Sequence, residues 1–122
     1  MGYDIQMHKN GKILKVEQFK AGGMHSLEGT TKAEISITYN YAWFFYKFID
    51  KEKGIRIIYK KTGKDAKNLL QKAIDELCTK GMGNGDDQTD NYWTPTPSNV
   101  TKVLKTLVRW CDQHPEGIFK GD

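Results

Sequence analysis

The sequence lacks any long apolar run, and no stretch approaches the roughly 20 residues that a membrane-spanning helix needs. Residues 1–4 have neither the basic part nor the apolar part of a secretory signal. Cysteine is scarce, because Cys78 and Cys111 are the only two, and each falls within an apolar helical pattern. We therefore expect two buried thiols without a disulfide, and a cytosolic protein with no membrane partner.

Motifs for catalysis and metal binding are also missing. The sequence Thr62-Gly63-Lys64 is partly similar to a phosphate-binding loop, but no glycine lies five residues before Gly63. The three histidines have no partner at metal-ligand spacing, and no nucleophile-elbow pattern occurs. The acidic stretch 83–90 lacks the glycine and the closing glutamate of a calcium loop, which favours a solvated loop over a cation site. The sequence thus favours a binding protein over an enzyme, with no cofactor and no metal.

What the chain does contain is an ordinary folded composition. Its 122 residues are 38% hydrophobic and 28% charged, which fits one domain spanning residues 1–122 with one core. The formal net charge of +4 suits an anionic partner without demanding one.

The N-terminal third has the alternating pattern of β-strands. Residues 3–7 and 13–16 flank Asn10-Gly11, the strongest short signal for a hairpin turn. We expect a short strand within 24–27 and another over 33–39, with Ile35, Ile37 and Tyr39 on one face.

The remainder is predicted to be helical. Asn40 is a candidate N-cap for a helix over 41–51, and residues 55–59 fit either a short strand or a turn of helix. A second helix opens at 62–65 and ends at Gly81, and a third runs from a Thr96-Pro97 cap to about His114. We therefore predict an α+β fold, in which an N-terminal antiparallel sheet (the hairpin plus one or two further strands) packs against about three helices.

Residues 39–46 hold six aromatic rings in eight positions, more than one helix face can bury. On a helix, Tyr41, Phe44, Phe45 and Phe48 would face the core, while Trp43 and Tyr46 lie off that stripe. These two rings are either ordinary exposed side chains, a subunit interface or a base-stacking surface. We favour self-association, because exposed rings are costly unless they are covered.

The third predicted helix carries a basic stripe, since Lys102, Lys105 and Arg109 recur at i, i+3 and i+7. A solvated helix face is the simple interpretation. An anion site is the alternative, with Trp93 to stack on a base and polar groups at the start of the helix. Arg56, between apolar neighbours, is a second candidate for holding phosphate.

Four segments carry a resemblance to small phage and prophage proteins: ISITYNYAWFFY (35–46), GIRIIYKKTG (54–63), NYWTPTPSN (91–99) and PEGIFKGD (115–122). Within that set, the chain resembles the Thoeris anti-defence sponges. The resemblance implies a homo-oligomer built from dimers, which binds cyclic ADP-ribose isomers near subunit boundaries without cleaving them. For some members it also implies capture of cyclic trinucleotides at a separate site.

Chemistry, steered by this resemblance, gives the candidate ligand-binding residues. Arginine and lysine would contact phosphates, a ring would stack on the base, and hydroxyl and amide groups would add hydrogen bonds. The candidates are Arg109, Arg56, Lys105, Trp93, Phe45, Thr96, Asn99 and Asn91. The alternative functions are a protein-interaction inhibitor of a host defence effector, a non-specific nucleic-acid binder and an enzyme that degrades the signal. Nucleic acid is disfavoured, because about three cations on one helix would bind it weakly.

Overall fold

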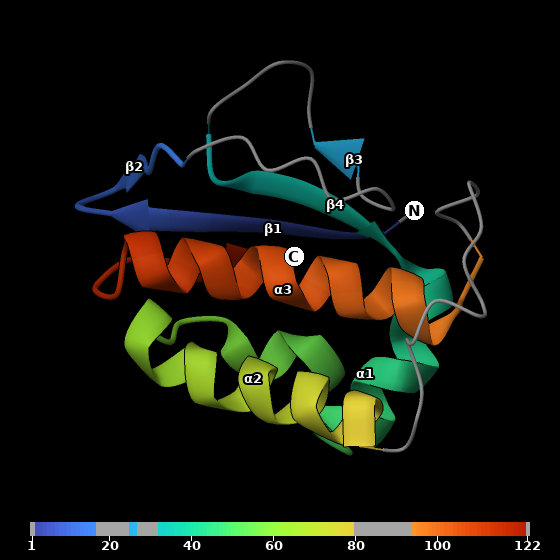
Figure 1. Ribbon diagram of the computed structural model, residues 1–122. Helices are drawn as coiled ribbons and strands as arrows, with labels where there is room; N and C mark the ends of the chain where they lie inside the picture. The colour runs from blue at the N-terminus through green and yellow to red at the C-terminus, as the bar shows by residue number, and fades with distance from the viewer. Residues whose placement is uncertain (1, 17–24, 27–31, 80–93, 122) are drawn as a thin grey trace.

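The computed structural model describes residues 2–16, 25–26, 32–79 and 94–121. These residues form an α+β fold, as predicted, with an antiparallel sheet on one side and the helices on the other (Figure 1). The strands are β1 (Gly2–Lys9), β2 (Lys12–Ile13), β3 (His25–Ser26), β4 (Glu34–Thr38) and β5 (Ile118–Gly121). The helices are α1 (Ala42–Phe48), α2 (Gly63–Thr79) and α3 (Pro97–Gln113), with 3₁₀ turns η1 (Tyr39–Tyr41) and η2 (Gly54–Ile58).

Strand β1 lies at the centre of the sheet. It pairs with β2 and β4 through the sheet order β2-β1-β4-β3, and β5 also pairs with β1. The predicted hairpin turn is confirmed: Asn10 has φ 54° and Gly11 has φ 77°, so both turn residues adopt the left-handed conformation that such a turn requires. Strand β5 was not predicted, because its four residues follow a helix and Phe119 is its one buried side chain.

The segment after β4 turns away from the sheet earlier than the alternation predicted. Ile35 and Ile37 are buried as expected, but Tyr39 already belongs to η1 and is partly exposed. Asn40 is not an N-cap: Thr38 caps η1 by accepting a hydrogen bond from the Asn40 backbone N–H, and Tyr41 precedes α1 without a side-chain cap. Helix α1 ends at Phe48, before the predicted end at residue 51. Residues 55–59, predicted as either a short strand or a turn of helix, lie mostly in the 3₁₀ turn η2.

Helices α2 and α3 pack against each other in opposite directions, and a salt bridge between Lys67 and Asp112 joins the start of α2 to the end of α3. The predicted cap of α3 is confirmed, since Thr96 accepts a hydrogen bond from the Asn99 backbone N–H and Pro97 begins the helix. The predicted end of α2 at Gly81 lies outside the described residues.

Helix α3 lies between the sheet and α2 (Figure 1). Most of its side chains are therefore buried, and only a narrow stripe remains exposed. The prediction for the two cysteines is half right: Cys111 on α3 is buried, but Cys78 on α2 is exposed. Cys78 lies at the margin of the apolar stripe of α2, one position beyond the buried Leu77.

Among the described residues, no helix combines the length and the apolar character that crossing a membrane requires.

Candidate functional site

Three exposed aromatic rings of the described residues lie on one face of the segment η1–α1. Tyr41, Phe44, Phe45 and Phe48 are buried, as the helical spacing predicted. Tyr39, Trp43 and Tyr46 lie on the opposite face, where they are 36%, 56% and 36% exposed. Large apolar side chains rarely remain this exposed in a cluster without a binding role.

Arg56 lies beside these rings. Its guanidinium carbon is 4.8 Å from the centre of the Tyr3 ring and 5.8 Å from that of Tyr39. Tyr3 comes from β1 and is buried. Its ring packs edge-to-face against the Tyr39 ring, with 4.8 Å between the ring centres. Cation–ring contacts of this length hold a guanidinium in place against the rings.

Gly54 completes the arrangement. It begins η2 with φ +58°, and the Tyr46 ring lies about 3.5 Å from the position that a Cβ would take there. The turn η2, which carries Arg56, thus packs against Tyr46 of α1 at Gly54. We call Tyr3, Tyr39, Tyr46 and Arg56 the Arg56–tyrosine site.

The site places the Arg56 guanidinium against the ring of Tyr3. Burial raises the pKa of Tyr3, the nearby Tyr46 hydroxyl raises it further, and Arg56 opposes both. Tyr3 therefore remains a neutral phenol in the ordinary pH range. A single guanidinium flanked by rings is suited to bind an anion attached to a planar group.

A second cation–ring contact lies on the same helical segment. The Lys47 ammonium is 4.7 Å from the Trp43 ring centre and 5.9 Å from that of Phe48. Lys47 itself is exposed, so its charge faces solvent above a ring. We call this contact the Trp43–Lys47 pair.

No family model, no curated protein and no solved structure matches this chain. The site is therefore assigned from its own geometry.

Three of the predicted ligand-binding residues have structural roles instead. Phe45 is fully buried, at 0% exposure, and its ring centre lies 5.6 Å from that of Tyr3. Neither side of its ring is therefore exposed for stacking on a base. Asn99 is equally buried, and its side-chain N–H donates to the Thr94 carbonyl at 2.9 Å. The Thr96 hydroxyl caps α3 at the Asn99 N–H. In the structure, Phe45 thus belongs to the core and Asn99 to the start of α3.

The basic stripe of α3 is where the spacing placed it. Lys105 and Arg109 are exposed one turn apart, and Lys102 is half-buried beside them. However, ten residues separate Asn99 from Arg109, which is about 15 Å along a helix. Arg109 and the start of α3 are therefore two separate places and not one site. Trp93 and Asn91 lie outside the described residues.

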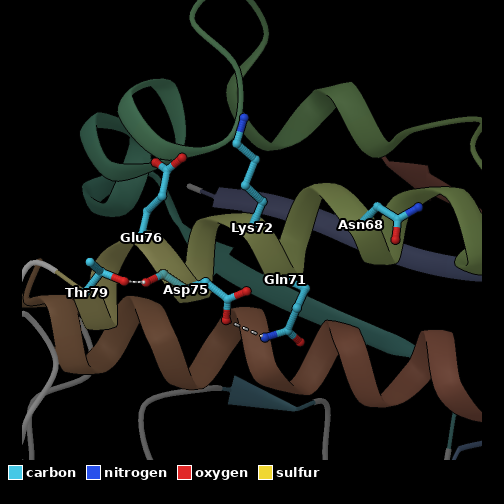
Figure 2. Close-up of a pocket in the computed structure, with 6 residues that line it drawn as sticks. All are labelled: Asn68, Gln71, Lys72, Asp75, Glu76 and Thr79. Carbon is cyan, nitrogen blue, oxygen red and sulfur yellow. Dashed lines mark hydrogen bonds between the residues drawn. The ribbon is translucent and has the colours of Figure 1, made fainter.

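A shallow hollow of about 410 Å³ lies on the outer surface of α2 (Figure 2). In this view Gln71 and Asp75 point to one side of the helix, and Lys72 and Glu76 point to the other. Gln71 donates a hydrogen bond to Asp75 at 3.0 Å. The described lining residues all come from α2, and are Asn68, Gln71, Lys72, Asp75, Glu76 and Thr79. Its two carboxylates oppose an anionic ligand, and its side chains diverge rather than converge.

Within the described part of the chain, no three His, Cys, Asp or Glu side chains come together as metal ligands.

Two rings of the Arg56–tyrosine site, Tyr3 and Tyr39, were not predicted as site residues, because the sequence placed them in the sheet. The signal that pointed toward them was the position of Trp43 and Tyr46 off the buried stripe of the helix.

Proposed function

We propose that this protein binds a nucleotide signal and holds it without cleaving it. The observation that carries the proposal is the position of Arg56, whose guanidinium lies against Tyr3 and Tyr39 beside the partly exposed Tyr46. A phosphate can pair with the guanidinium while the base stacks on a tyrosine ring.

The resemblance to the Thoeris anti-defence sponges supports a specific ligand class. The proposed ligands are cyclic ADP-ribose isomers made by TIR enzymes, and cyclic trinucleotides are further ligands of the same chemistry. In this proposal the protein is phage-encoded, acts in the cytoplasm of the infected bacterium and works as a homo-oligomer.

Sequestration sets an energetic requirement. Holding a scarce signal at nanomolar concentration takes roughly −12 kcal/mol. Charge-assisted contacts and ring stacking supply that only from a pre-formed site. The cation–ring contacts of Arg56 provide this preorganisation, because Tyr3 is part of the rigid core of the sheet.

The test is to incubate the purified protein with the cyclic product of an activated TIR enzyme, filter it, heat the protein fraction and identify the released molecule by mass. Recovery of the intact cyclic nucleotide is expected. A ligand that remains in the filtrate, or returns as a linear product, contradicts sequestration.

Variants connect this assay to the site. Arg56→Ala should weaken binding by about 1.5–3 kcal/mol, the range for a charged hydrogen bond. Lys53→Ala is the matched control, because Lys53 is an exposed cation three residues away. Arg109→Ala, measured alongside, tests the α3 stripe as a separate contact: a loss of affinity would add Arg109 to the binding surface, and unchanged affinity excludes it.

A protein-interaction inhibitor is the second candidate, and the 56% exposure of Trp43 favours it. Aromatic side chains are enriched in protein–protein interfaces. A stable complex with a host defence protein, formed without any bound nucleotide, would select this function over sequestration.

A further inference from the structure

We propose that the Arg56–tyrosine site and the Trp43–Lys47 pair form one continuous surface, and that it recognises a nucleoside carrying two separate phosphate groups. This inference rests on the proposed nucleotide-binding function and specifies the ligand of the same site. One phosphate would pair with Arg56, the base would stack on the exposed rings, and the second phosphate would pair with Lys47.

Helical spacing makes the surface continuous. Helix α1 follows η1 directly in the chain, so Tyr39, Trp43 and Lys47 are successive residues four apart. Side chains at this spacing lie next to one another on one helix face. Tyr46, on the same helix, is 36% exposed.

Each end of the surface carries a cation that a ring already positions. Arg56 contacts Tyr39 at 5.8 Å at one end, and Lys47 contacts Trp43 at 4.7 Å at the other. Both distances are within the range of favourable cation–ring contacts. The order along the surface is therefore cation, ring, ring, cation.

Charge complementarity identifies an anionic occupant. Residues 39–49 contain no acidic side chain, so nothing on this helical segment opposes a phosphate. The nearest carboxylate in sequence, that of Asp50, accepts backbone N–H groups of Glu52 and Lys53 at 3.0 and 2.7 Å. Alternating cations and exposed rings are the arrangement by which proteins bind short single-stranded nucleotides, through phosphate pairing and base stacking.

The experiment compares three probes by calorimetry at low ionic strength: ribose 5-phosphate, adenosine 5′-monophosphate and adenosine 3′,5′-bisphosphate. The monophosphate should bind more tightly than ribose 5-phosphate, because only it carries a base to stack. The bisphosphate should bind about fivefold more tightly than the monophosphate, the gain expected from one exposed ion pair.

Two lysine variants locate that gain. Lys47→Ala should remove the fivefold advantage of the bisphosphate and leave the affinity for the monophosphate nearly unchanged. Lys51→Ala is the matched control, because it removes the same charge from an exposed position four residues away. The control should keep the advantage, and circular dichroism verifies that both variants fold.

The outcomes separate the two proposals. Equal affinity for the mono- and bisphosphate, or equal losses in Lys47→Ala and Lys51→Ala, overturns this inference while the proposed function stands. Equal affinity for ribose 5-phosphate and the monophosphate excludes base stacking and overturns it as well. If none of the three probes binds, both this inference and the nucleotide site at Arg56 fail.

Discussion

At the scale of single residues, the two cysteines have opposite environments although both lie in apolar helical patterns. Cys78 is exposed on α2, and Cys111 is buried on α3. A thiol reagent should therefore modify one cysteine of the folded protein rapidly and the second only after unfolding. Peptide mapping identifies which site reacts. Rapid modification of Cys111 under native conditions would contradict its placement in the core.

The buried thiol also predicts a pH dependence of stability. Burial raises the pKa of Cys111 from 9.0 to about 12, so the folded state keeps the proton over a range where the unfolded thiol loses it. Between these values the folded chain binds more protons than the unfolded chain, and stability must fall as pH rises. The stabilisation that comes from the protonated Cys111 thiol is fully present below pH 9. By pH 10 about 1 kcal/mol of it is lost.

Urea unfolding at pH 8 and pH 10 measures this effect. Cys111→Ala lacks the titrating group, so the difference in unfolding free energy between the natural protein and this variant should shrink by about 1 kcal/mol at the higher pH. Lysine and tyrosine titrations are common to both proteins and cancel in the comparison. A difference that stays constant from pH 8 to 10 would show that the thiol ionises equally in both states.

At the scale of elements, the contact between α2 and α3 depends on a glycine. A Cβ at Gly63 would lie 2.6 Å from the His114 carbonyl oxygen and 3.1 Å from the Cys111 Cα, both backbone atoms. Helix propensity favours Gly63→Ala by about 0.5–1 kcal/mol, whereas overpacking against backbone costs about 1–3 kcal/mol. The steric cost is the larger, so Gly63→Ala should destabilise the protein.

Thermal or urea unfolding of Gly63→Ala tests this sign. Lys64→Ala is a suitable control, because Lys64 is the next residue of α2 and is exposed. Its substitution should leave stability within about 0.5 kcal/mol, as surface changes usually do. A more stable Gly63→Ala protein would mean that the two helices separate without cost.

Elements with a strong local signal could be predicted from the sequence. The hairpin turn at Asn10-Gly11, the cap of α3 at Thr96 and the buried stripe of α1 each depend on neighbouring residues only. Strand β5 and the early departure of Tyr39 from the sheet could not be predicted, because both depend on pairing with distant segments. Cys78 was misplaced, since a periodic pattern defines the centre of an apolar stripe better than its margin.

The candidate site could be predicted only in part, because it too depends on contacts between distant segments. Sequence reasoning selected Arg56 and noted that Trp43 and Tyr46 lie off the buried stripe. It could not bring Tyr3 to Arg56, because the sheet and η2 join segments from opposite ends of the N-terminal half. It also assigned a ligand to Phe45 and Asn99, because composition does not reveal which rings and amides the core already uses.

At the scale of the whole molecule, the exposed rings predict self-association. Trp43 is more than half exposed beside Tyr39 and Tyr46, and burying such a cluster against a second copy removes apolar surface from water. Sedimentation should show a species larger than the monomer of 14.0 kDa, and Trp43→Glu should shift it toward the monomer. Lys51→Glu, which introduces a glutamate at an exposed position without removing a ring, should associate normally.

The same face is proposed to bind the nucleotide, so association and ligand binding must be linked. If the ligand lies between two copies, adenosine 3′,5′-bisphosphate will raise the associated fraction, and dilution will weaken ligand binding. If the second copy and the ligand compete for the rings, the bisphosphate will instead dissociate the assembly. A protein that is monomeric at all concentrations, with or without the bisphosphate, would contradict self-association through the rings and leave them entirely to the ligand.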